Sequence, residues 1–167
     1  MKSTLKIITI LFTSIFMSCG DIGEKEQGGF SYETNSTRQT ATTNPSIKAP
    51  PSQQITLTHK GIGPITSIEL PAKIDQTMVA VGYEINKKMC AACHRPDKKF
   101  IGPAPKGIME RRSPEWIMNM ILNPEEMLRK DPLAKNLFVE FNYAPMIKQD
   151  LTQVDARAIL EYYRTLK

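Results

Sequence analysis

The chain has 167 residues, 41% of them hydrophobic, and a formal net charge of +5 at pH 7. A chain of this length can fold as one modest domain, provided that most of it takes part in the core. The positive charge comes without a nucleic-acid-binding motif or an aromatic platform for bases, so we expect no nucleic-acid partner.

Residues 1–18 predict an export signal. Lys2 and Lys6 provide the positive start, and an apolar run of eleven residues follows at 7–17. That run is shorter than the about 20 apolar residues that span a bilayer. The alternative is a buried core helix, but a polar tract follows the run directly, which disfavours it.

Cys19 directly follows this signal. It lies in the sequence "FMSCG", which resembles the processing site of bacterial lipoproteins. In such proteins the cysteine becomes the lipidated first residue of the mature chain. Phe16 departs from the leucine that is usual three positions earlier. The alternative is ordinary signal cleavage with Cys19 as a free thiol. Three cysteines leave one over from any pair, and a lipid on Cys19 accounts for it.

The next two segments are predicted to be non-helical. Residues 19–54 contain almost no large apolar side chain and cannot offset the entropy of ordering, so we predict a flexible tether. Residues 55–74 again contain several β-branched residues, together with a Gly-Pro pair. This pattern indicates an extended strap packed on the following domain.

Residues 75–167 predict an all-α domain of about four to five helices without a convincing strand pair. Apolar residues at helical spacing predict a first helix from Asp75 to Met89, directly before two cysteines. Capping residues, proline and acids predict four further helix starts, at Ser113-Pro114-Glu115, Asn123-Pro124, Asp131-Pro132 and Thr152 with Asp155.

The stretch Cys90-Ala91-Ala92-Cys93-His94 carries the chemistry, and three interpretations compete for it. A structural zinc site needs four ligands, whereas this stretch offers three and the other histidine, His59, lies 31 residues before Cys90. A thioredoxin-like disulfide requires a βαβ pattern, which the chain lacks. In the third interpretation, two thiols one helical turn apart bond the vinyl groups of a haem, and the adjacent His94 binds its iron. Export favours this one, because c-type haem is attached outside the cytoplasm.

From Asp75 to Lys167 the chain resembles a monohaem class I cytochrome c. Gly82, eight residues before Cys90, matches the glycine at which the first and last helices of that family cross. Ile159 and Tyr162 match the opposing pair on the last helix. Asn86 replaces the aromatic residue that usually lies four positions before the first cysteine. The resemblance implies a class I cytochrome c fold around one covalently bound haem c.

The same resemblance implies the ligands of the iron. Ile101-Gly102-Pro103 matches the family's Gly-Pro segment, so the Pro103 carbonyl would accept a hydrogen bond from His94 and raise its basicity. Met146, in the loop before the last helix and 52 residues after His94, is the expected sixth ligand. The competing methionines lie in or near helices, where they are more often core residues: Met109, Met118, Met120 and Met127. His59 is the bis-histidine alternative.

Arg111, Arg112 and Trp116 are the candidate partners of the haem propionates. A guanidinium pair can neutralise two carboxylates with directed hydrogen bonds, and the family often uses an arginine or an indole there. The alternative is a solvated arginine pair and a core indole.

With both axial positions filled, the expected function is one-electron transfer by a carrier that is not an enzyme. Residues 87–112 hold eight lysines and arginines against two acids, and this basic region would steer acidic redox partners. The alternative is a solvated face that also neutralises the propionates.

The stretches "RRSPEWIMNMILNPEEM" and "DARAILEYYR", residues 111–127 and 155–164, are similar to small cytochromes that accompany periplasmic reductases, including nitrous oxide reductase. We therefore expect a lipid-anchored protein that faces the periplasm, with a quinol-oxidising complex as donor and a terminal reductase or oxidase as acceptor. Two alternatives stay open: a haem sensor or enzyme in which Met146 dissociates, and a non-redox module that docks to a membrane complex.

Overall fold

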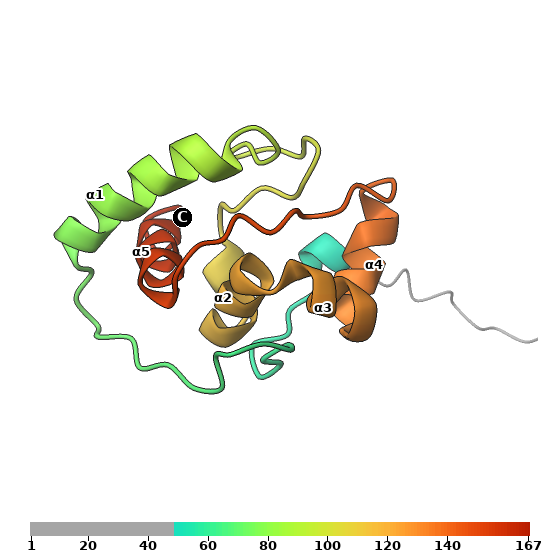
Figure 1. Ribbon diagram of the computed structural model, residues 1–167, viewed down its shortest axis with the longest axis horizontal. Coiled ribbons are helices and arrows are strands. Elements are labelled where there is room, and N and C mark those ends of the chain that lie inside the picture. The colour runs from blue at the N-terminus through green and yellow to red at the C-terminus, as the bar shows by residue number, and fades with distance from the viewer. Residues whose placement is uncertain (1–48) are drawn as a thin grey trace, which may run out of the picture. The chain divides into compact units, whose positions relative to one another are not determined.

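The computed structural model describes residues 49–167 (Figure 1). The predicted export signal, Cys19 and most of the predicted tether lie outside the described residues. Within residues 49–167, no helix combines the length and apolar character needed to cross a membrane.

The described residues form helices joined by turns and extended segments, and they contain no β-strand apart from a single bridge between Thr56 and Arg112. The helices are α1 (Gln76–Ile85), α2 (Pro114–Leu122), α3 (Pro124–Lys130), α4 (Pro132–Glu140) and α5 (Gln153–Tyr163). A π-helical turn, Asn86–Cys90, continues α1, and 3-10 turns lie at Pro51–Gln53 and Ile108–Glu110. The prediction of an all-α domain is confirmed.

The helix boundaries follow from local capping. The side chains of Ser113 and Asp131 accept hydrogen bonds from the first turns of α2 and α4, and Thr152 forms a complete capping box with Asp155. Asn123 differs from the prediction, because its side chain does not cap α3 but donates to the Ile62 carbonyl at 3.3 Å. The proline at the first position of α3 starts that helix without a side-chain cap.

Helices α1 and α5 cross in close contact, as Figure 1 shows. A Cβ atom added to Gly82 would lie 2.0 Å from the carbonyl oxygen of Ala158, so only glycine allows this approach. The rings of Tyr83 and Tyr162 meet edge to face beside the crossing, with centroids 5.6 Å apart. The glycine and the last-helix residues singled out in the sequence therefore lie at this crossing.

Asn86, which stands where the family usually has an aromatic residue, is buried at the C-terminal end of α1. The hydroxyl of Tyr163 on α5 donates to its Oδ1 at 3.1 Å. A polar contact between the π-helical turn that continues α1 and helix α5 thus takes the place of aromatic packing at this position.

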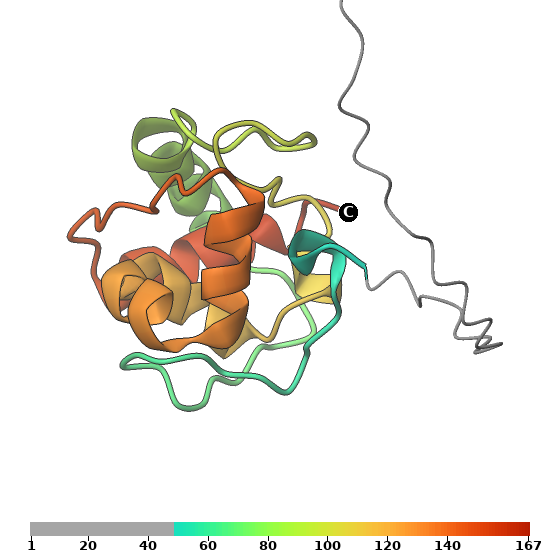
Figure 2. The same cartoon turned by 90° about the vertical axis from the view of Figure 1, so that its right-hand side faces the viewer.

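Residues 55–74, here called the strap, run in an extended path alongside α2 (Figures 1 and 2). Asn119 on α2 holds the strap, because its Oδ1 accepts from the Ile65 N–H and its Nδ2 donates to the carbonyls of Lys60 and Ile65, each at 2.9 Å. A Cβ atom on Gly63 would lie 2.4 Å from Asn119 Oδ1, so the strap lies directly against this side chain.

The described residues just before the strap also contact the helical domain. Ser52, within the predicted tether, donates to the Glu140 carboxylate on α4 from both its N–H, at 2.7 Å, and its hydroxyl, at 2.5 Å. The guanidinium of Arg112 donates to the carbonyls of Pro51 and Gln54. The last residues of the predicted tether therefore contact the helical domain.

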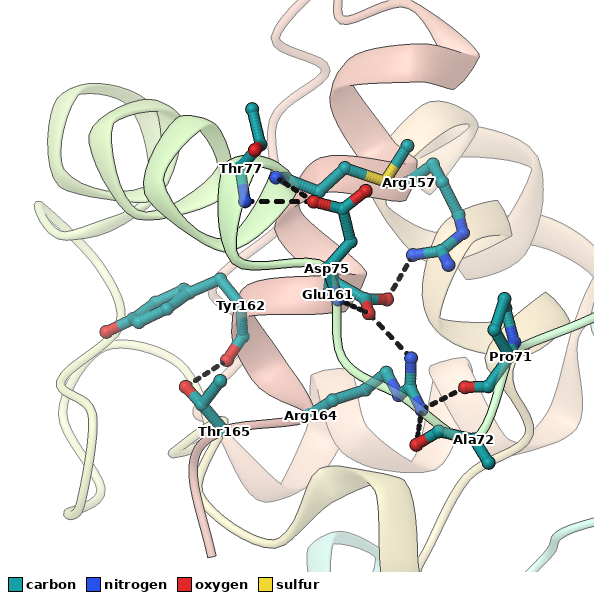
Figure 3. A network of polar contacts seen from close by, with 10 residues as sticks. Pro71, Ala72, Asp75, Thr77, Arg157, Glu161, Tyr162, Arg164 and Thr165 are labelled. Carbon is teal, nitrogen blue, oxygen red and sulfur yellow. Dashed lines mark hydrogen bonds and ion pairs between the residues drawn. The ribbon is translucent and has the colours of Figure 1, made fainter.

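At the other end of the strap, a buried carboxylate organises a polar network, shown in Figure 3. Glu161 on α5 accepts from Arg157 at 2.5 Å, Arg164 at 2.6 Å and the Asp75 N–H at 2.8 Å. Arg164 also donates to the carbonyl of Pro71 at 2.6 Å. Burial acts to raise the pKa of Glu161, but the hydrogen bonds from Arg164, the Asp75 backbone and Arg157 outweigh it and lower that pKa.

Candidate haem site

A largely apolar cleft lies between α2, α4, the loop at residues 101–105 and the loop at residues 141–152, here called the Met146 loop. About 950 Å³ among these residues is not filled by protein atoms, part of it open to solvent. Cys90, His94 and Met146 all line this cleft. The structure therefore brings the predicted proximal and sixth ligands to one space, although they are 52 residues apart in the chain.

The two cysteines lie where the π-helical turn ends. The N–H groups of Cys93 and His94 both bond to the Cys90 carbonyl, at 3.1 and 2.9 Å, so the motif forms one tight turn. Cys90 is buried, Cys93 is exposed, and the two do not form a disulfide. Burial raises the pKa of the Cys90 thiol and the neighbouring Cys93 adds to this, whereas the nearby Tyr163 hydroxyl acts in the opposite direction. Cys90 is thus uncharged at neutral pH before it is bonded to haem.

His94 is held by the segment that the sequence singled out. Its Nδ1 lies 2.8 Å from the carbonyl oxygen of Pro103. Since a carbonyl can only accept, Nδ1 carries the proton and Nε2 keeps a free lone pair for a metal. A Cβ atom on Gly102 would lie 2.5 Å from Cε1 of the ring, and the Gly102 N–H bonds to the Cys93 carbonyl at 2.9 Å. Gly102 therefore lets the backbone pass against the imidazole.

Among the methionines of residues 49–167, two line the cleft. Met146 lines it from the Met146 loop and is partly buried, and Met120 lines it from α2. Met118 and Met127 are core residues, and the Met127 sulfur accepts from the Ile62 N–H at 3.0 Å. Met146 as the iron ligand stays a prediction, and Met120 is its nearest rival by position.

His59, the bis-histidine alternative, is not among the residues that line the cleft. Its Nε2 instead contacts the carboxylate of Asp131, at the start of α4. The structure gives this histidine a partner 72 residues away.

The predicted propionate partners all line the cleft, but their hydrogen-bond donors contact protein groups. Arg111 donates to the carbonyls of Gly107 and Lys106, at 2.9 and 3.0 Å. Arg112 donates to the Pro51 carbonyl and lies over the Trp116 ring, 5.4 Å from its centroid. The Trp116 indole N–H points to Asp131, at 3.4 Å. Burial and the neighbouring Arg111 lower the pKa of Arg112 to about 10, so it is cationic at neutral pH. Their role toward propionates stays a prediction.

Tyr163 and Asp131 are the residues of this region that the sequence reasoning missed. Tyr163 lines the cleft beside Cys90 and bonds to Asn86, and the polar residue at position 86 was the one signal that could have suggested a buried partner. Asp131 was assigned only as the start of a helix, because its contacts with His59 and Trp116 are distant in sequence.

The residues fit a covalently attached haem. A largely apolar cleft holds a thiol, a histidine whose tautomer leaves Nε2 free, and a thioether sulfur, which together suit a haem iron. Over residues 49–167, by contrast, no three His, Cys, Asp or Glu side chains gather closely enough to bind a metal ion, as a closed zinc site would require.

Comparisons with known proteins agree with this assignment. The family described as cytochrome c matches residues 79–167. Cytochrome c from Rhodothermus marinus has a similar structure, with 39% identity and a TM-score of 0.60 over 62% of this chain and 89% of the other. An engineered form of it, bound to a carbene intermediate, is 40% identical with a TM-score of 0.58, covering 62% of this chain and 89% of that one. A search of curated proteins found no match.

Proposed function

The chain belongs to the cytochrome c family, and from this premise we propose that it is a membrane-tethered one-electron carrier with His94 and Met146 as axial ligands. Its cofactor is a covalently bound haem c with iron. When bound, this haem supplies an iron centre that passes between the ferric and ferrous states by one electron.

One observation carries the proposal: a histidine with a fixed tautomer and a methionine sulfur line the same apolar cleft. The Pro103 carbonyl orients His94, and the apolar walls limit access of water to the site. Two protein ligands leave no coordination position for a substrate, which favours a carrier over an enzyme.

The test is an optical redox titration of the full chain, produced together with the haem-attachment machinery. We expect a pyridine haemochrome spectrum typical of two thioether bonds and a reversible one-electron transition. The variant with both Cys90→Ala and Cys93→Ala should lose the covalent haem. A wild-type protein without the thioether signature, or without a reversible transition, would contradict the proposal.

A basic groove beside the cleft supports steering of acidic partners. Lys98, Lys99, Lys106 and Arg111 line it together with Asp97 and Glu140. Lys99 is held over the Phe141 ring, 4.5 Å from its centroid, and donates to the Glu140 carbonyl at 3.2 Å. Cations fixed in this way raise the rate of encounter with an acidic protein, and salt weakens the effect.

Steering is tested by the rate of electron exchange with a small acidic redox protein as a function of salt. In the double variant Lys98→Glu and Lys99→Glu we expect the rate at low salt to fall by roughly tenfold and the salt dependence to flatten. Lys130→Glu on α3, outside the groove, is the control. Equal rates in both variants would reject steering by this groove.

The proposed location and partners rest on the sequence. We propose that Cys19 carries a lipid that anchors the protein on the periplasmic side of a membrane, with a quinol-oxidising complex as donor. A terminal reductase or oxidase, with nitrous oxide reductase as one candidate, is the proposed acceptor. A diacylglyceryl mass shift on the Cys19 peptide tests the anchor, and oxidation of the reduced protein by each purified reductase tests the acceptor.

A second candidate function is a haem sensor or enzyme in which Met146 dissociates to admit a small ligand. The Met146 loop favours it, because Asn142, Tyr143 and Asp150 all have positive φ, a backbone region that non-glycine residues rarely adopt. Carbon monoxide binding to the reduced protein at neutral pH would support this alternative over the carrier.

A further inference from the structure

A chain of polar contacts joins solvent to the wall of the haem cleft, outside the ligands already described. It begins at His59, whose side chain is 42% exposed, and continues to Asp131, whose side chain is 0% exposed. Asp131 contacts Trp116, and Trp116 lines the cleft. A titratable side chain at the surface is thus linked to the cleft through one fully buried carboxylate.

The carboxylate of Asp131 is surrounded by N–H groups. Oδ1 accepts from the backbone of Ala134 at 2.8 Å and from the indole of Trp116 at 3.4 Å. Oδ2 contacts Nε2 of His59. Ala134 also lines the cleft, so two of the three groups bound to this carboxylate belong to the cleft wall.

We propose that Asp131 is the buried charge that sets the reduction potential of this protein, and that His59 links that potential to pH. The proposal rests on the electron-carrier function above and adds residues to it. A negative charge behind the cleft wall stabilises the more positive ferric state over the ferrous state. At the effective dielectric constant of about 20 inside a protein, one buried unit charge near the haem changes such an equilibrium by on the order of tenfold.

The His59–Asp131 pair carries a net charge of −1 when the imidazole is neutral and 0 when it takes up a proton. Reduction of the iron removes one positive charge, which makes proton uptake by the pair more favourable. Electron uptake and proton uptake therefore support each other, and the potential is higher at low pH than at high pH.

Two basic residues near the pair, Arg112 and Lys60, have interaction partners of their own. Arg112 stacks on Trp116, and its charge interacts with those of Asp131 and Glu140. Lys60, next to His59 on the strap, pairs with Glu115 on α2 at 3.6 Å. Of the side-chain types in this group, only an imidazole ordinarily changes charge between pH 5 and 8.

A purely structural role for Asp131 makes a different prediction. Asp131 caps α4, and asparagine caps a helix nearly as well as aspartate. Asp131→Asn therefore keeps the cap and an oxygen for the indole while it removes the charge. Glu126→Gln is the matched control, because it removes a carboxylate from an ion pair with Lys130 on the preceding helix, at residues that do not line the cleft.

The experiment is a potentiometric titration of the haem-loaded wild type and variants from pH 5 to pH 8. At pH 8, Asp131→Asn should shift the ferric–ferrous equilibrium toward ferrous by about tenfold, which is about 59 mV upward, whereas Glu126→Gln should leave it unchanged. His59→Gln should match the wild type at pH 8 and lose the rise toward pH 5. The indole N–H resonance of the single tryptophan, with thermal unfolding, reports whether the fold is retained.

A folded Asp131→Asn protein whose potential equals that of Glu126→Gln would overturn the role of Asp131. A rise toward pH 5 that persists in His59→Gln would overturn the role of His59. Should Asp131→Asn not fold, the His59→Gln titration still decides the proton link. A wild type without reversible reduction would instead refute the carrier function itself, which keeps the two failures distinct.

Discussion

The two sides of the cleft are built by different means. On the side of His94, the crossing of α1 and α5 is tightly packed, with seven of the eleven residues of α5 buried. On the side of Met146, residues 142–152 are irregular, none of them is buried, and three have positive φ. The proximal ligand thus sits next to regular, buried structure, whereas the predicted sixth ligand depends on backbone conformation in an exposed loop.

Because of this difference, we expect the two regions to control different properties of the protein. The helix crossing should control whether the domain folds, because buried close contacts tolerate little change. The Met146 loop should control the properties of the iron centre, because loops open at low free-energy cost while the core stays intact. Four substitutions test this division, from the largest expected free-energy change to the smallest.

The first substitution, Gly82→Ala, tests the crossing. The added methyl group would meet the Ala158 carbonyl oxygen, which is backbone and cannot move aside as a side chain can. We expect a loss of about 3 kcal/mol in the free energy of unfolding, measured by urea denaturation of the haem-loaded protein. Val81→Ala, at an exposed position of α1, should change it by less than about 0.5 kcal/mol. A stabilised Gly82→Ala protein would show that the helices do not cross this closely.

Replacement of the sixth ligand tests the loop side. In Met146→Ala the reduction potential should fall by on the order of 0.1 V, equivalent to about 2 kcal/mol, and the weak near-infrared absorption of methionine-bound ferric iron should vanish. Met120→Leu, which replaces the other cleft-lining methionine with a side chain of similar size, should keep both properties. The reverse pattern would identify Met120 as the ligand.

Glu161→Gln tests the network that ties α5 to the strap and to the start of α1. The folded state lowers the pKa of Glu161, so its contribution to stability is present above the unfolded value of about 4.3 and is lost as pH falls through the folded value. We expect a loss of about 2 kcal/mol at pH 7 and a weaker decline in stability below pH 5 than in the wild type. Urea denaturation at pH 7 and pH 4 measures both effects, and an unchanged decline would exclude Glu161 as its source.

The smallest effect is expected in the Met146 loop. Asp150 has φ of 51°, and a β-branched residue is strained in that region, so Asp150→Val should cost about 1 kcal/mol. Gln149→Val, next to it with negative φ, is the control. Thermal unfolding measures stability, and the near-infrared absorption shows whether the strained loop still holds Met146. Equal behaviour of the two variants would mean that the loop does not depend on this backbone conformation.

What the sequence predicted depends on how far apart the interacting residues lie. The helix starts at Ser113, Asp131 and Thr152 were predictable because a cap and its N–H partner are three residues apart. His94 and Pro103 were predictable because a short motif holds both.

The contacts of the strap could not be predicted in this way. Its path depends on Asn119, whose partners are 54 and 59 residues away, and no local pattern marks a buried amide that binds backbone groups. The contact between His59 and Asp131 could not be predicted either. From the sequence, His59 is simply a surface histidine and Asp131 simply the cap of a helix. The arginines were chosen for their charge, but hydrogen bonds to backbone carbonyls cannot be seen in a sequence.

The strap also bears on the order in which the domain assembles. Arg112 holds Pro51, just before the strap, and Arg164 holds Pro71 near its far end, across 61 and 93 residues. Because closing long loops costs more entropy than forming local helices, contacts of this separation tend to form late in folding. The strap is synthesised before helices α1 to α5. We nevertheless expect it to dock last, onto a helical core that has already formed.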